Sequence, residues 1–127
     1  MHNRPEQDIL AVIQTYLDGL YEGDTAKLAQ AFHPAAHLFC TTGNTLVDVD
    51  QQQWYALVNG RPSAKAKGQG REHEAILLLD ITGPNTALVK LRCAILPRVF
   101  TDYLSLVLLD GRWQIISKTY HYEILPA

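Results

Sequence analysis

Asp102 and His121 are the residues whose chemistry first indicates a site in this sequence. They lie on two apolar segments joined by Asp110-Gly111, a pair that supplies the positive φ angles of a two-residue hairpin turn. Pairing outward from that turn places every second pair of side chains on one face. That face carries Phe100, Asp102, Leu104, Leu106 and Leu108 opposite Trp113, Ile115, Ser117, Thr119 and His121. Its polar members gather at the end far from the turn.

A carboxylate and an imidazole on an otherwise apolar face are suited to general acid/base chemistry. Desolvation raises the pKa of a carboxyl group and a neighbouring imidazolium lowers it, so such a pair can be poised near neutral pH. The alternative is structural: Asp102 bonds Thr119 or a backbone group, and His121 lies at a wet sheet edge. A slip of one residue in the register would exchange the two faces.

Metal and cofactor motifs do not occur in the sequence. Walker and GxGxxG patterns are missing, and no histidine pair has the spacing of H-E-x-x-H, so we expect neither a metal nor a cofactor. His73 alternates with apolar residues at the start of a segment and could line a pocket. Cys40 and Cys93 lie in apolar contexts typical of inert core thiols, and Cys40 becomes relevant if a pocket reaches it.

Helical patterns occupy the first half of the sequence. Apolar spacing predicts a helix from Gln7 to Gly23, where glycine accepts the left-handed conformation that ends helices. Asp24 is a candidate N-cap for a short second helix that Pro34 ends, and Asp50 for a third helix running to about Asn59. Between the last two, 36–41 predicts a strand and 45–49 an extended stretch.

Strand patterns fill the second half, over the ranges 73–82, 86–96, 99–109 and 112–123. Arg61 to Arg71 interrupts the two halves with basic and small residues and no acid, which indicates a mobile surface loop rather than a phosphate site. Helices followed by a long antiparallel meander predict an α+β fold, with the helices on one face of a curved sheet.

The opposite face of the predicted hairpin is also apolar, with Tyr103, Ile116, Tyr120 and Tyr122 among its residues. Lys118 is predicted to lie among them. Large exposed apolar patches usually mark interfaces, so we expect a homodimer packed through this outer sheet face. The alternative is an aromatic surface that stays partly exposed.

Composition limits the classes of function. The 127 residues carry a net charge of -2, with 47% hydrophobic and 19% charged residues, as expected for one globular domain spanning 1–127. A balance this close to neutral predicts no nucleic-acid partner. No apolar run is long enough for a membrane span and the first residues lack a signal-peptide core, so the predicted location is cytoplasmic.

Several segments together resemble the nuclear transport factor 2-like superfamily, also known by its ketosteroid isomerase-like and SnoaL-like members. The resemblance rests on Tyr16 to Asp24, Phe32 to Leu38, Phe100 to Leu106, and Asp110 to Ile115 with Lys118, and spans nearly the whole chain. The closing hairpin is most similar to the lumazine-binding branch. The resemblance implies a cone-shaped α+β barrel, cystatin-like in outline: a strongly bent, mixed or antiparallel sheet curled around three N-terminal helices, with a deep apolar pocket and usually a dimer.

The steroid isomerases of this superfamily have an oxyanion hole made by a tyrosine and a protonated aspartate, an enzyme for which that pairing is a well-known case. By spacing, Tyr16 and Asp102 resemble those two residues. The resemblance departs at the general base, where this sequence has Cys40, so steroid isomerase activity itself is not expected. His121 or His37 would have to supply a base for different chemistry.

Two functions follow as alternatives. In the first, the pocket binds a small, largely apolar or aromatic ligand with isomerase- or dehydratase-type chemistry at Asp102, His121 and Tyr16. In the second, the chain is a non-catalytic carrier or protein-interaction module with a structural polar cluster. Five further residues are predicted to line the pocket in either case: Trp54, Cys40, His73, Phe100 and Thr119.

Overall fold

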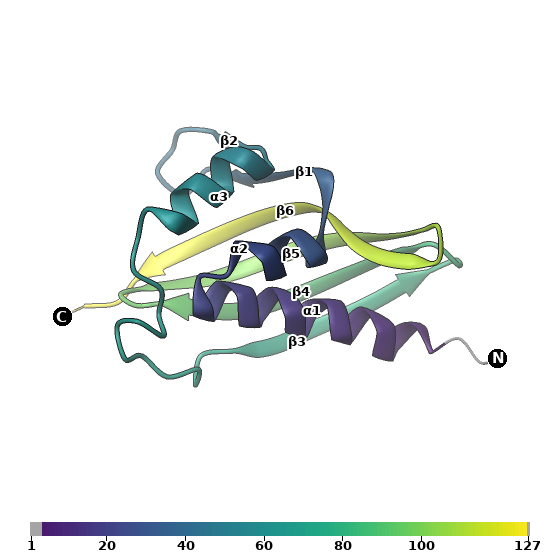
Figure 1. Ribbon diagram of the computed structural model, residues 1–127, viewed down its shortest axis with the longest axis horizontal. Coiled ribbons are helices and arrows are strands. Elements are labelled where there is room, and N and C mark those ends of the chain that lie inside the picture. The colour runs from purple at the N-terminus through teal and green to yellow at the C-terminus, as the bar shows by residue number, and fades with distance from the viewer. Residues whose placement is uncertain (1–3, 127) are drawn as a thin grey trace.

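Three helices lie on one face of a six-stranded sheet in the computed structural model, which describes residues 4–126 (Figure 1). The fold is α+β, as predicted. The elements in chain order are α1 (Pro5–Glu22), α2 (Thr25–Ala31), β1 (Phe32–Cys40), β2 (Val47–Val49), α3 (Gln51–Asn59), β3 (Ala75–Thr82), β4 (Thr86–Ile95), β5 (Arg98–Leu109) and β6 (Arg112–Ile124).

The strand order of the sheet is β2-β1-β6-β5-β4-β3. β1 pairs with β6 in parallel, and every other neighbouring pair is antiparallel, so the sheet is mixed. Neither β2 nor β3 has a second neighbour, so the sheet is not closed. The β1–β6 pairing brings the first strand in chain order beside the sixth, and it places the N-terminal helices over the long C-terminal hairpin.

The helix α1 packs on the sheet through one stripe of side chains. Ile9, Ile13, Tyr16 and Leu20 recur at helical spacing and are all buried. Burying each such side chain stabilises the fold by about 1.5–3 kcal/mol. Gly23 ends the helix with a φ of 68°, in the left-handed region, as the sequence predicts.

Side-chain caps begin the two shorter helices at the predicted positions. Asp24 accepts hydrogen bonds from the backbone N–H groups of Ala26 and Lys27, and Asp50 forms a capping box with Gln53. The end of α2 differs from the prediction, because the strand β1 already begins at Phe32 and runs through Pro34. Proline fits there because the pairing of β1 with β6 is irregular between Phe32 and His37.

The turn between β5 and β6 has positive φ angles at Asp110 (53°) and Gly111 (76°), which confirms the predicted two-residue hairpin. The register follows the prediction as far as the pair of Leu106 with Ile115. Beyond it Ser105 pairs with Ser117, so Ile116 is an extra residue in β6, a β-bulge. Every β6 side chain after the bulge therefore faces the side opposite to the one that a regular ladder predicts.

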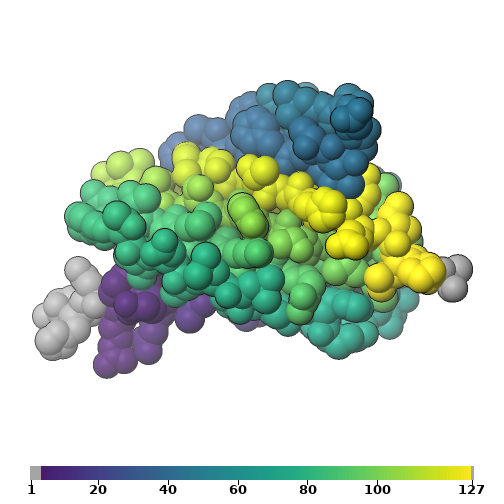
Figure 2. All heavy atoms as spheres, turned by 180° about the vertical axis from the view of Figure 1, so that it is seen from behind, coloured from purple at the N-terminus to yellow at the C-terminus, as the bar shows by residue number. Residues whose placement is uncertain are grey.

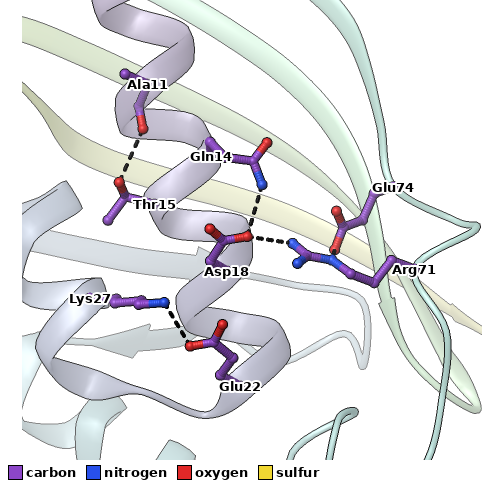
Figure 3. Close-up of polar contacts among 8 residues, drawn as sticks. All are labelled: Ala11, Gln14, Thr15, Asp18, Glu22, Lys27, Arg71 and Glu74. Atoms are coloured by element: carbon purple, nitrogen blue, oxygen red, sulfur yellow. Dashed lines mark hydrogen bonds and ion pairs between the residues drawn. The ribbon is translucent and has the colours of Figure 1, made fainter.

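The segment between α3 and β3 is anchored at its C-terminal end, contrary to the prediction of a mobile loop. Arg71 donates from Nη2 to Asp18 Oδ1 of α1 at 2.9 Å and from Nε to Glu74 Oε2 at 2.8 Å (Figure 3). The guanidinium also lies 4.7 Å from the centroid of the Tyr21 ring. Gln14 adds a hydrogen bond of 2.8 Å to the same Asp18 oxygen (Figure 3).

The middle of the same segment is fixed by Gln69. Its side-chain amide donates to the backbone carbonyl of Leu96 and accepts from the Leu96 N–H, at 3.2 and 2.9 Å. Its own backbone carbonyl accepts a hydrogen bond of 2.8 Å from the Tyr21 hydroxyl. The loop thus joins the C-terminal end of α1 to the turn between β4 and β5, because one amide side chain bonds both backbone groups of that turn residue.

Among residues 4–126, no helix lies on the other face of the sheet. Figure 2 shows it from behind, with the strands β3 to β6 forming most of the surface and α1 visible only at the lower edge. Leu78 and Tyr103 are exposed there, at 47% and 51%. The sequence predicts Ile76 on this face too, but a bulge in β3 pairs it with the inward-facing Leu91 and turns it to the helix side. The predicted apolar outer face therefore exists on β3 and β5.

Asp18 provides a test of the loop anchor. Partial burial alone would raise the pKa of Asp18, but hydrogen bonds from Gln14 and Arg71 outweigh it and lower that pKa below its ordinary value. We expect Asp18→Asn to reduce the free energy of unfolding by about 0.5–1 kcal/mol near neutral pH, as for a partly exposed ion pair. The loss should be measured by urea unfolding.

The pH dependence of that loss has a defined sign. Because the folded-state pKa of Asp18 is lowered, its contribution is present above the unfolded-state value of about 3.9 and is lost as the pH falls through the folded-state value. The matched control is Asp80→Asn, at an exposed position of β3. An equal effect of both substitutions at every pH would contradict the anchor.

Candidate functional site

The bulge at Ile116 turns the side chain of Lys118 toward the helices. Lys118 pairs with Leu104 of β5 and with Leu38 of β1, two buried residues that also face the helices. Its side chain is only 7% exposed. A lysine among apolar residues in the interior needs compensation for its charge, since an unpaired buried charge is strongly unfavourable.

Lys118 lines a cavity of about 80 Å³ between the helices and the sheet. Leu20, Leu38, Trp54 and Phe100 are among its apolar walls. The volume is about half of the roughly 150 Å³ of an apolar cavity that holds benzene. The enclosed part therefore has room for a functional group and a few carbon atoms, and a larger ligand would extend through the opening.

Asp102 compensates the charge of Lys118 from beneath the cavity. Lys118 Nζ lies 3.8 Å from Asp102 Oδ2, and Asp102 is fully buried. The Tyr16 hydroxyl donates a short hydrogen bond to the same oxygen. Within residues 4–126, Asp102 Oδ1 is a buried side-chain atom without any hydrogen-bond partner. Neither Tyr16 nor Asp102 lines the cavity, so Lys118 is the member of this cluster that a ligand would meet.

Three aromatic rings surround the Lys118 ammonium. Its Nζ lies 5.1 Å from the ring centroids of Tyr16 and Trp54 and 5.0 Å from that of Tyr120. Each contact lies within the range of a cation–π interaction, which strengthens when water is excluded. The three rings and the Asp102 carboxylate together hold a positive charge at the cavity wall.

Two phenol groups and one thiol in or near the cavity have raised pKa values. Burial, followed by the charge of Asp102, raises the pKa of Tyr16 well above its ordinary value. Burial likewise raises the pKa of the Cys93 thiol, which lines the cavity, and the pKa of Tyr120. These groups therefore stay protonated near neutral pH, as hydrogen-bond donors rather than bases.

Arg61 and Arg98 line the same cavity from the loop after α3 and from the start of β5. Burial of the guanidinium, followed by the charge of Arg98, lowers the pKa of Arg61 from its ordinary value. Val47 and Leu57, both largely exposed, lie beside them in the lining. With Lys118, three cations line one small cavity, a pattern suited to anionic or strongly hydrogen-bond-accepting ligands.

Of the predicted catalytic residues, the structure brings together only Tyr16 and Asp102. His121 lies on the opposite face of the sheet, because the bulge pairs it with Thr101 instead of Phe100. Its side chain is 60% exposed, with Nδ1 3.3 Å from the Thr42 hydroxyl. The prediction that Asp102 and His121 lie together on one face of the sheet is therefore wrong.

The predicted lining residues divide in the same way. Trp54 and Phe100 line the cavity. Thr119 lies with His121 in a shallow hollow of the outer face, turned away by the bulge. Cys40 is buried and donates to the Thr42 hydroxyl at 3.3 Å, outside the lining, and His73 is half-buried in the turn before β3.

Sequence reasoning missed the basic residues of the cavity. Lys118 was predicted on the outer face by the regular register, and Arg61 was included in a solvated loop. One signal was present in the sequence: Lys118 and Tyr120 alternate with Thr119 and His121, so the two sets must face opposite sides. Which set faces inward depends on the bulge.

The described residues support neither a metal site nor a membrane-spanning helix. Among 4–126, no group of three or more His, Cys, Asp or Glu side chains could hold a metal ion. In that same range, no helix has the length and apolar character needed to cross a membrane.

The fold and the cavity define an NTF2-like α+β protein, and the comparisons with known proteins agree. The family model described as "Putative lumazine-binding" matches residues 4–121. The chain belongs to this family, and it shares its fold with NTF2-like proteins, as the sequence predicted.

Solved structures share the fold at low sequence identity. An NTF2-like protein from Methylobacillus flagellatus KT superposes with a TM-score of 0.82 at 24% identity, covering 97% of this chain and 95% of that one. An NTF2-like protein from Silicibacter pomeroyi DSS-3 gives 0.81 at 20%, covering 93% and 95%. A ketosteroid isomerase-like protein from Erwinia carotovora atroseptica gives 0.73 at 13%, covering 95% and 98%.

Among characterised proteins, the aldolase FrzH from a Cladobotryum species is 24% identical over 115 residues. The match covers 89% of this chain and 87% of that protein.

Tyr16 provides a test of the buried cluster. We expect Tyr16→Phe to reduce the free energy of unfolding by about 1–3 kcal/mol, because Asp102 Oδ2 loses its donor in a fully buried site. Because the folded-state pKa of Tyr16 is raised, the contribution of its hydroxyl to the free energy of unfolding depends on pH. It is complete below the unfolded-state value of about 10 and is lost as the pH rises through the folded-state value, so the difference from wild type narrows there.

Denaturant unfolding from neutral to alkaline pH measures both effects. The matched control is Tyr103→Phe, which removes a hydroxyl from the exposed outer face and should change stability by less than about 0.5 kcal/mol. Equal losses from the two variants would refute a special role for the Tyr16–Asp102 bond.

Proposed function

We propose that this chain binds a small, largely apolar or aromatic molecule whose carbonyl or carboxylate oxygen accepts a hydrogen bond from Lys118. The single observation that carries the proposal is the position of this ammonium group. It is almost fully buried, surrounded by three aromatic rings, and lines a cavity with largely apolar walls. A few polar groups in an apolar cavity are typical of small-molecule sites.

The polar group that receives the ligand differs from the one implied by the steroid isomerases. There, a tyrosine and a protonated aspartate both donate to the substrate oxygen. Here Tyr16 donates to Asp102, and a carboxylate next to an ammonium only accepts. Lys118 then takes the donor role, with Asp102 as its counter-ion.

The charges at the cavity favour a ligand with a negative group. Arg61 and Arg98 add two donors to the lining, and guanidinium groups recognise carboxylates and phosphates with paired hydrogen bonds. Trp54 and Phe100 supply flat apolar walls. A planar acid, such as a benzoate with a second oxygen substituent, fits both requirements.

Binding is favoured over proton-transfer chemistry of the isomerase or dehydratase type. The described residues that line the cavity include no histidine, aspartate or glutamate. The thiol and phenol that do line it, Cys93 and Tyr120, have raised pKa values and are poor bases near neutral pH. A non-catalytic ligand carrier is thus favoured, because that function needs no general base in the cavity.

Stabilisation of an enolate is the second candidate function. An ammonium fixed in a dry site can polarise a carbonyl group and stabilise the oxyanion that forms. The similarity to the aldolase FrzH supports this reading, since carbon–carbon bond formation next to a carbonyl passes through such an oxyanion or its equivalent.

The homodimer and the cytoplasmic location stay predictions. A dimer through the outer face would cover Leu78 and Tyr103, which are otherwise exposed to water. Two free cysteines, Cys40 and Cys93, are consistent with a reducing compartment.

Binding of 4-(hydroxymethyl)benzoate tests the proposal. We expect this planar acid to bind the wild-type protein, and Lys118→Met to weaken binding at least about tenfold, the loss of about 1.4 kcal/mol. Trp54 forms part of the cavity, so tryptophan fluorescence can report the titration, with calorimetry as the independent measurement.

The controls separate the site from the general charge of the surface. Lys90→Met and Arg92→Gln remove cations from the outer-face side of β4 and should leave the dissociation constant unchanged, whereas Arg98→Gln should weaken binding. Binding that is insensitive to Lys118→Met would disprove the assigned donor.

Tyr103→Glu tests the predicted dimer. The substitution introduces a charge in the exposed outer face and should convert a dimer to a monomer in sedimentation experiments. Leu10→Glu, at a partly exposed position of α1, is the matched control and should not change the mass. A monomeric wild-type protein would contradict the prediction directly.

A further inference from the structure

The Lys118–Asp102 pair is incompletely satisfied on both sides. The distance of 3.8 Å from Nζ to Oδ2 exceeds that of a hydrogen bond, and within residues 4–126 Asp102 Oδ1 has no partner. A buried ammonium and a buried carboxylate usually complete such bonds, because each unmade bond costs free energy. The carboxylate therefore keeps a vacant acceptor next to an amine that lines a cavity.

From this geometry we infer that Lys118 forms an imine with an aldehyde or ketone bound in the cavity, and that Asp102 accepts and returns the proton that this reaction moves. The inference rests on the proposed function, since the cavity must first bind a small carbonyl compound. It adds a covalent step and defines the ligand class as carbonyl compounds that also carry an anionic group.

The step balances without any further reagent. The Lys118 ammonium gives one proton to the Asp102 carboxylate, and the free amine attacks the carbonyl carbon. The nitrogen then passes one proton to the former carbonyl oxygen, takes the first proton back from Asp102, and passes a second proton to that oxygen, which leaves as water. An ammonium and a carbonyl thus become a protonated imine and one molecule of water, with the positive charge kept.

The Lys118 nitrogen carries one positive charge both before the reaction, as an ammonium, and after it, as a protonated imine, so the same surroundings suit both. The Asp102 carboxylate and the rings of Tyr16, Trp54 and Tyr120 stabilise a positive charge at the Lys118 nitrogen. They stabilise the protonated imine in the same way as the ammonium, so forming the product loses none of this electrostatic stabilisation. The neutral amine is needed only transiently, and Asp102 next to it can take the proton.

The other described lysines differ from Lys118 in burial. Lys65 and Lys67 lie on the exposed loop, Lys27 pairs with Glu22 near the surface, and Lys90 lies on the outer face. Unlike these lysines, Lys118 lines the proposed binding cavity, and an amine held next to a bound carbonyl group reacts faster than one that meets it from free solution. Selective reaction at position 118 is therefore measurable against an internal reference.

The experiment uses 4-carboxybenzaldehyde with cyanoborohydride, which reduces an imine to a stable amine. Peptide mass mapping of the intact protein then gives the extent of labelling at each lysine. We expect Lys118 to be labelled at least about tenfold faster than Lys90, as for a nucleophile activated in its site. Competition by 4-(hydroxymethyl)benzoate, which has no carbonyl group to react, should slow labelling at Lys118 alone.

Two variants test the assigned roles. Lys118→Arg keeps the charge but has no primary amine, so it should abolish labelling at this position. Asp102→Asn keeps the lysine and removes the proton acceptor, so labelling should slow by about a hundredfold, a usual contribution of a general base. Lys90→Arg is the control and should leave labelling at Lys118 unchanged.

The outcomes separate the two proposals. Labelling spread evenly over the surface lysines, together with normal binding of 4-(hydroxymethyl)benzoate, would overturn the imine and leave the binding function intact. Neither labelling nor binding would overturn both. Because mapping of the wild-type protein already distinguishes these results, the test does not depend on whether either variant folds.

Discussion

A fully buried carboxylate, Asp102, determines how the interior of this protein is arranged. A charge at that position requires donors, and the structure supplies Tyr16 from the first helix and Lys118 from the sixth strand. Tyr16 and Asp102 are 86 residues apart in the chain, so their hydrogen bond fixes α1 against the middle of the sheet. Lys118 connects this cluster to the cavity, because Lys118 lines the cavity and Tyr16 and Asp102 do not.

The local signals of the sequence were sufficient for most of the fold. Gly23, Asp24, Asp50 and the Asp110-Gly111 turn each have a conformational requirement that few other residues meet, and each is where it was predicted. The NTF2-like fold was also predicted correctly from the order of these segments, and the family match confirms the lumazine-binding branch. These features depend on neighbours in the chain, which the sequence displays directly.

The site was only half predictable, and the reason is a single residue. Ile116 adds one position to β6, and since strand side chains alternate with a period of two, it exchanges Thr119 and His121 for Lys118 and Tyr120. The sequence around Ile116 does not predict a bulge, because isoleucine is equally suited to a regular strand. The geometry is set by the partner strands, since β1 also shifts its register opposite the same region.

The parallel pairing of β1 with β6 has a consequence for the order in which the molecule can assemble. In the chain, β1 and β6 are separated by β2, α3 and the β3–β4–β5 meander, so their pairing closes a long chain loop. Contacts of such high sequence separation slow folding, because the entropy of loop closure is spent before the contacts stabilise anything. A nascent chain that has completed β1 but lacks β6 would expose the apolar side of its first strand and helix. The cluster of Tyr16, Asp102 and Lys118 can therefore serve as a marker of completed folding, since no two of its members come from the same strand or helix.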